Sequence, residues 1–78
     1  MSNPDAEEAR ILLVNTTPIE LCQFMKLGGL AQSGGEAKHL IRGGHVLLNG
    51  EVETRKGKKL LPGDRVTFEG RTLILQTG

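Results

Sequence analysis

The apolar residues change their spacing along the chain, and each spacing predicts a different kind of element. Residues 11–14 (ILLV) form an unbroken apolar run, whose length favours a short buried strand. Apolar residues then recur at helical spacing between residues 21 and 25, behind a segment (TPIE, residues 17–20) whose threonine, proline and glutamate stand at capping-box positions. The pattern therefore predicts a strand at residues 11–14 and, from Pro18, a helix of about ten residues.

A second helix is predicted over residues 34–42. Residues 33–36 (SGGE) repeat the capping-box spacing, and three apolar residues follow at helical spacing before two glycines end the element. Lys38 and Arg42 stand four residues apart on the remaining surface, so both side chains share one exposed flank. This helix should therefore bury one face and present cations on another.

From residue 46 onward, apolar residues alternate with polar ones, which is typical of strands. Asn49-Gly50 predicts a hairpin turn, but a two-residue turn would place Leu48 opposite Glu51, so a bulge or a longer loop stays open as an alternative. Pro62-Gly63 suits a type II turn, and two further strands follow it. The chain thus predicts an α+β fold, with two short helices packed on a small, mostly antiparallel sheet of about four or five strands.

Length and composition limit what this fold can do. The 78 residues suffice for a single domain at residues 11–78, whereas residues 1–10 are polar and acidic and are expected to form a flexible arm. The net charge is only +1, yet residues 1–36 carry two cations against five anions and residues 37–78 carry eight against four. A longest apolar run of four residues and a single cysteine predict a cytoplasmic protein without membrane contact.

No catalytic constellation is visible in the sequence. Cys22, His39 and His45 lack the spacing of a metal site, and the carboxylates at residues 7–8 and 51–53 have no apolar pocket of the kind that acid–base catalysis uses. We therefore expect no catalytic residue, no metal, no cofactor and no small-molecule substrate. The histidines, which flank basic positions, are expected to face solvent or RNA.

Basic residues and a helix end offer an anion site instead. The amides of Gly34 and Gly35 open the second helix behind Ser33 and can receive a phosphate, although a simple helix cap explains these residues equally well. Residues 54–59 (TRKGKK) hold four cations, either as a solvated loop or as a phosphate contact. Because the chain has no Tyr or Trp and its two Phe look like core residues, we expect contacts to the phosphate and sugar of structured RNA and no base stacking.

Residues 20–66 resemble the RNA-binding domain named after ribosomal protein S4. The similarity rests on motifs that stand in one order and spacing: Gly29-Leu30, Ser33, Glu36-Ala37-Lys38, Leu40-Ile41, Gly44, Val46, Asn49-Gly50 and Pro62-Gly63-Asp64. The stretch ETRK at residues 53–56 is similar to that of the stand-alone, single-domain members. The resemblance implies an αL-type RNA-binding motif of two helices on a small sheet, with RNA lying across the second helix and the adjoining hairpin loops.

Carried onto this chain, the resemblance assigns RNA contacts to Ser33, Lys38 and Arg42, and a weaker one to Lys26. Together with the candidates argued from the residues alone, the predicted RNA-binding residues are Lys26, Ser33, Gly34, Lys38, His39, Arg42, Arg55, Lys56, Lys58 and Lys59.

Three residues at two places depart from the family pattern. The usual Arg-Leu-Asp at the start of the first helix reads Glu20-Leu21-Cys22, and the usual arginine after the serine is Gly34. We hypothesise that the cations of residues 55–59 compensate for the missing contacts.

These features predict an RNA-binding module that contacts structured ribosomal or transfer RNA, with the ribosome or a protein as a further partner. The alternative is a protein-interaction module that kept the fold with little RNA affinity, since the net charge is low and two family positions have changed. A ubiquitin-like sulfur carrier is a third class, which the ending Gln76-Thr77-Gly78 disfavours because it lacks a penultimate glycine.

Overall fold

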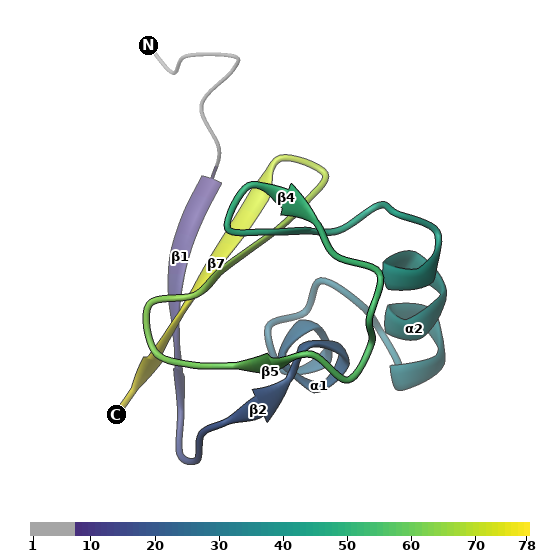
Figure 1. Cartoon of the computed structure of the whole chain (residues 1–78). Coiled ribbons are helices and arrows are strands. Elements are labelled where there is room, and N and C mark those ends of the chain that lie inside the picture. Colours follow the sequence, from purple (N-terminus) through teal and green to yellow (C-terminus); the bar gives the residue numbers. More distant parts are fainter. Residues whose placement is uncertain (1–7) are drawn as a thin grey trace, which may run out of the picture.

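The computed structural model describes residues 8–78, which form two helices and two sheets (Figure 1). A five-stranded sheet has the strand order β1-β7-β6-β3-β4, and a two-stranded sheet pairs β2 with β5. This is the expected α+β fold. In chain order the elements are β1 (Glu8–Val14), β2 (Ile19–Glu20), α1 (Leu21–Leu27), α2 (Gly34–Arg42), β3 (Leu47–Leu48), β4 (Glu51–Val52), β5 (Lys59–Leu60), β6 (Arg65–Phe68) and β7 (Arg71–Thr77).

Strand β1 begins earlier than the apolar run that predicted it. It pairs in parallel with β7 along its whole length, from Glu8 opposite Arg71 to Val14 opposite Thr77. The other pairs in this sheet are antiparallel. The arm boundary at residue 10 was therefore wrong, because the backbone of β7 pairs with residues 8–10 whatever their polarity. Residues 1–7 of the predicted arm lie outside the described residues.

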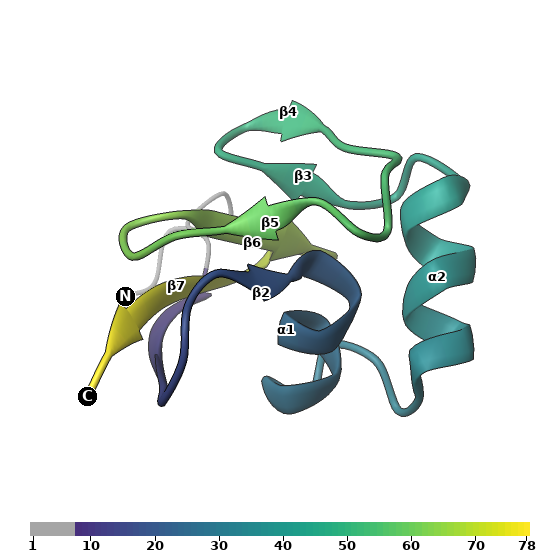
Figure 2. The same ribbon diagram turned by 60° about the horizontal axis from the view of Figure 1, so that its bottom comes forward.

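The apolar run of β1 is only partly buried. Ile11 and Leu13 are each 63% exposed, whereas Val14 is 6% exposed and Leu12 packs against the core. Side chains alternate between the two faces of a strand, and the helices pack against only one face of this sheet. Figure 2 shows α1 below the strands and α2 beside one end of them. The prediction of a buried strand was thus wrong for the two residues on the outer face.

Helix α1 begins at Leu21, three residues later than predicted. Ile19 and Glu20 form β2 and pair with Leu60 and Lys59 of β5. Glu20 makes no side-chain hydrogen bond that caps the helix. The N–H groups of Leu21 and Cys22 instead donate to carbonyl oxygens of residues 58 and 56, at 2.9 and 3.2 Å. The capping-box interpretation was wrong because the backbone partners of this segment come from a distant part of the chain.

Helix α2 confirms the local prediction. The Oγ atom of Ser33 accepts from the Glu36 N–H at 3.1 Å, and a Glu36 carboxylate oxygen accepts from the Gln32 N–H at 2.9 Å. Ala37 and Ile41 are fully buried. Their burial fixes which side of α2 faces solvent.

Two predicted turns also form. Asn49 and Gly50 have φ values of 53° and 86°, and Leu48 lies opposite Glu51, so the hairpin has a two-residue turn without the bulge left open as an alternative. Gly63 has φ 94° and the Asp64 N–H donates to the Leu61 carbonyl at 3.0 Å, which is type II geometry. Between helices and sheet lies an aliphatic core whose largest fully buried side chains include Leu21, Phe24, Met25, Ile41, Leu60 and Leu75.

Candidate nucleic-acid interface

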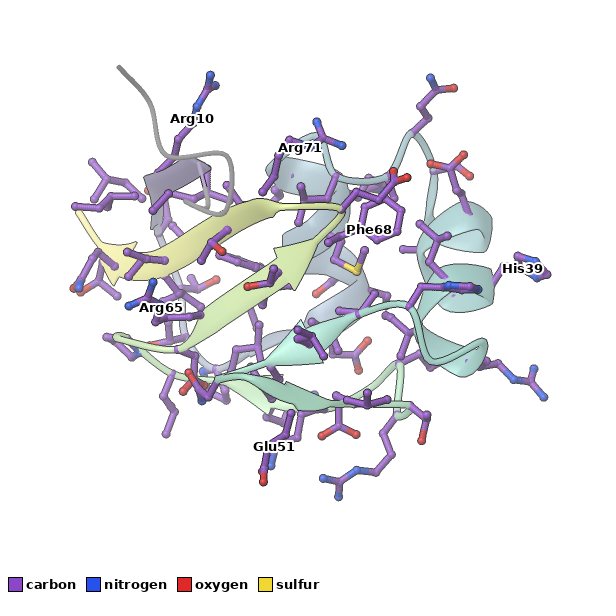
Figure 3. All side chains as sticks on the ribbon, turned by 90° about the horizontal axis from the view of Figure 1, so that it is seen from above. Arg10, His39, Glu51, Arg65, Phe68 and Arg71 are labelled. Atoms are coloured by element: carbon purple, nitrogen blue, oxygen red, sulfur yellow. The ribbon has the colours of Figure 1, made fainter. Side chains whose placement is uncertain are left out.

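Lys38, His39 and Arg42 form an exposed row on helix α2, which we call the α2 ridge. The buried face at Ala37 and Ile41 turns these side chains toward solvent. Figure 3 shows His39 pointing outward from the helix. Within residues 8–78, neither Lys38 nor Arg42 has an ion-pair partner. Two fixed positive charges one helical turn apart are thus available for phosphate oxygens.

At the start of α2, Ser33 caps the helix and the surface at Gly34 is open. Ser33 is used as the N-cap, so its side chain has a structural role whether or not it also meets RNA. A Cβ atom built on Gly34 would meet no atom within 4 Å. This surface is therefore accessible to a ligand, and the helix N-terminus adds a partial positive charge there.

Residues 55–59, which we call the basic loop, lie next to both helices. The backbone carbonyls of residues 56 and 58 accept the first N–H groups of α1, and Lys59 belongs to β5. The segment between β4 and β5 passes beside α2 in both Figure 1 and Figure 2. The basic loop thus lies near the helix that carries the α2 ridge (Figure 1 and Figure 2). Most residues of the loop are exposed, as expected for a solvated loop, while its backbone is hydrogen-bonded to α1.

Half of the cations in the basic loop are already paired. The Arg55 guanidinium donates to both Glu53 carboxylate oxygens, at 2.9 and 3.1 Å, and the Arg55 backbone N–H donates to the same carboxylate at 3.0 Å. These side-chain and backbone hydrogen bonds lower the pKa of Glu53 from its usual 4.5 to about 2. Lys59 Nζ lies 3.3 Å from Glu20 Oε2. Arg55 and Lys59 thus each face a carboxylate, although their side chains remain 69% and 61% exposed.

The other two cations of the basic loop differ from these. Neither Lys56 nor Lys58 forms an ion pair with another residue in the described part of the chain. Lys58 is half-buried, and its charge contributes a small part to the low pKa of Glu53. Lys56 is exposed. Lys56 is thus the loop cation best placed to meet a phosphate.

Lys26 is not brought together with these groups. It lies on α1 and lines a separate hollow with Thr16, Pro18 and Gln23.

Two residues that the sequence analysis did not select line an open hollow between α2 and the β6–β7 turn. They are Phe68, which was expected to be core, and Arg71. Phe24 is fully buried, but Phe68 is only partly buried. The signal was present in the sequence, because the two-residue turn at Glu69-Gly70 makes Phe68 and Arg71 opposite partners.

Metal-ligand clusters and membrane-spanning helices are two further features that bear on function. Residues 8–78 hold no cluster of three or more His, Cys, Asp or Glu side chains that could ligate a metal ion. None of the helices in the same range is long and apolar enough to cross a membrane.

Comparisons with known proteins agree with this geometry. YbcJ of Escherichia coli (strain K12) is 44% identical over 55 residues, which are 70% of this chain and 79% of that protein. RlbA of Bacillus subtilis (strain 168), named a probable ribosome maturation protein, is 41% identical over 70 residues, covering 90% and 89% of the two chains. The solution structure of Escherichia coli YbcJ, which reveals an αL motif involved in RNA binding, superposes with a TM-score of 0.62 at 33% identity, over 96% of this chain and 94% of that one. The family model for the S4 domain matches residues 12–76, and the protein therefore belongs to the S4 domain family.

Proposed function

We propose that this protein is a non-catalytic cytoplasmic module that binds structured RNA through phosphate contacts made by the α2 ridge and the basic loop. The observation that carries the proposal is the unpaired charge of Lys38 and Arg42 on the exposed side of α2. Lys56 of the basic loop is also exposed and has no ion-pair partner within residues 8–78. The net charge of the whole protein is only +1, so any attraction of RNA depends on where the cations stand and not on the overall charge. Membership of the S4 domain family and the RNA-related names of its relatives support the same function.

The shape of the surface favours folded RNA as the ligand. The cations stand on a helix and on a loop whose backbone is hydrogen-bonded to α1, and such a fixed surface suits the regular phosphates of an A-form helix. We propose ribosomal or transfer RNA as the target, and ribosomal RNA first, because one relative is named for ribosome maturation.

The test is a titration of a labelled, structured ribosomal RNA fragment with wild type and with the Lys38→Ala/Arg42→Ala variant, followed by fluorescence anisotropy at about 50 and 200 mM salt. If both side chains contact phosphates, the variant should lose about tenfold in affinity at the higher salt, and its salt slope should fall by about two units. Arg42→Gln and Arg65→Gln give a matched pair, because Arg65 is an exposed arginine on the sheet, outside the α2 ridge. An equal loss for both single variants would contradict a site on α2.

A protein partner is the second candidate, and the outer face of β1 favours it. Ile11 and Leu13 are each 63% exposed on a strand at the edge of the sheet. Heparin distinguishes the two functions, since a polyanion should displace RNA from the α2 ridge and should not compete at an apolar strand edge.

A further inference from the structure

The hollow between α2 and the β6–β7 turn has the composition of a nucleotide site. Its volume is about 510 Å³, which lies in the range of small-ligand sites. Leu30 and Leu40 supply aliphatic surface beside the partly buried ring of Phe68. Arg71 provides a positive charge at the same place.

Backbone pairing fixes the two central side chains beside each other. Phe68 and Arg71 are directly opposite partners across the β6–β7 turn, so their Cβ atoms lie on one face of the sheet at about 5 Å. It is the face of Val66 and Leu73, which pair with each other two residues further along and are buried against the core. Figure 3 shows the Phe68 ring between the β6–β7 turn and α2, with Arg71 at that turn. An aromatic surface and a guanidinium are thus held side by side at the rim of the core.

The charges around the hollow divide it into two parts. Arg71 has no ion-pair partner within residues 8–78. Glu36 and Glu69 also line the hollow, and one Glu36 oxygen already accepts the Gln32 N–H. A phosphate is therefore favoured only on the Arg71 side, whereas the carboxylates can accept hydrogen bonds from the amino group of a base.

The hollow continues the proposed RNA surface. His39 lines it and also lines the hollow of the α2 ridge, together with Lys38 and Arg42. A phosphate backbone that follows α2 thus reaches Phe68 without crossing the molecule.

We infer that this hollow binds one unpaired nucleotide of the RNA, with its base against Phe68 and its phosphate at Arg71. The inference rests on the proposed function and adds recognition of an unpaired base to phosphate binding. From the absence of Tyr and Trp we expected no base stacking, but one partly buried phenylalanine beside an arginine is sufficient for one base.

The experiment compares two RNA hairpins that differ only in one unpaired adenosine in the stem. Wild type should bind the bulged hairpin about five- to tenfold more tightly than the fully paired one, which is the effect of one stacked base. Phe68→Leu keeps an apolar side chain against the core and should lose this preference while binding the paired hairpin as well as wild type does. Arg71→Gln should weaken binding of the bulged hairpin more than Arg65→Gln does.

Two controls separate this inference from the proposed function. Lys38→Ala/Arg42→Ala should weaken binding to both hairpins and leave their ratio unchanged. Resonances of the Phe68 ring should shift in NMR spectra with the bulged hairpin and stay in place with the paired one. Equal affinity of wild type for the two hairpins, or an unchanged preference in Phe68→Leu, would overturn the nucleotide site alone. Failure of wild type to bind either hairpin would overturn the proposed function and the nucleotide site together.

Discussion

The α2 ridge and the basic loop carry similar cations but hold them in different ways. On the ridge, Lys38 and Arg42 project from a helix whose cap and buried face are formed by its own neighbours, and they have no ion-pair partner within residues 8–78. In the loop, Arg55 and Lys59 are bound to Glu53 and Glu20. We therefore expect the loop to contribute less to RNA binding than its number of basic residues suggests. Positive charge that a carboxylate already neutralises releases few counterions when a phosphate arrives.

The largest difference between paired and unpaired cations is expected in the salt dependence of RNA binding when the unpaired lysines of the loop are removed. Lys56→Gln/Lys58→Gln should lower the salt slope of RNA binding by up to about two units, because each lost phosphate contact removes about 0.9. Removing an ion pair as a unit, in Glu53→Gln/Arg55→Gln, leaves the net charge unchanged and should leave the slope close to that of wild type. Anisotropy titrations over a series of salt concentrations measure both.

The hypothesis that all four loop cations compensate for the altered family positions is tested by the same titrations. If the variant without the ion pair loses as much slope as the lysine variant, the paired arginine does contact phosphate and the two regions are equivalent. If neither variant changes the slope, the basic loop has no part in RNA binding and the α2 ridge acts alone.

The same distinction between local and distant contacts explains what the sequence could predict. Residues 33–36 cap α2, Asn49-Gly50 turns a hairpin and Pro62-Gly63 forms a type II turn, all as predicted, since each depends on neighbouring residues. The start of α1 was wrong because Ile19 and Glu20 pair with β5, about forty residues away. Residues 17–20 carry a local capping pattern, but Ile19 and Glu20 form strand hydrogen bonds with β5 instead of the first turn of a helix.

The site residues likewise fall into those that local spacing predicts and those that depend on contacts between distant segments. The exposed flank of Lys38 and Arg42 follows from helical spacing, and the Arg55–Glu53 pair could have been found, because residues two apart in an extended segment share a face. The Lys59–Glu20 pair could not, since it depends on the β2–β5 pairing. Phe68 was expected to be a core residue, and it does pack against the core. The turn at Glu69-Gly70 could have paired it with Arg71, but its place in the hollow beside α2 depends on the tertiary structure.

A smaller effect, on the free energy of unfolding, is expected from the N-cap of α2, which stabilises the helix that carries the α2 ridge. Ser33→Ala removes the acceptor for the Glu36 N–H and should lower the free energy of unfolding by about 1 kcal/mol, whereas Ser33→Thr should retain most of it. Thermal or urea unfolding measures the difference. If Ser33 acts only as the cap, RNA affinity measured well below the melting temperature should be the same for both variants. A selective loss of affinity in Ser33→Ala at full helicity would instead assign the hydroxyl a direct contact with RNA.

The smallest effect on stability is expected from breaking the Arg55–Glu53 pair. The pKa of Glu53 directly measures how firmly Arg55 is held. Hydrogen bonds from the Arg55 side chain and backbone lower the pKa of this carboxyl to about 2, so Arg55→Gln should return it toward 4.5. Because the pKa is lower in the folded than in the unfolded state, the pair stabilises the protein above about pH 4.5, and this stabilisation is lost as the pH falls through 2. Wild type and Arg55→Gln should therefore differ in stability at neutral pH and converge near pH 2.

NMR titration of the Glu53 side chain measures its pKa directly, and the same titration with saturating RNA shows whether Arg55 stays with Glu53 in the complex. A pKa that stays low in the complex means that Arg55 remains with Glu53, whereas a rise means that a phosphate has taken the arginine and that the loop contributes more than its free lysines.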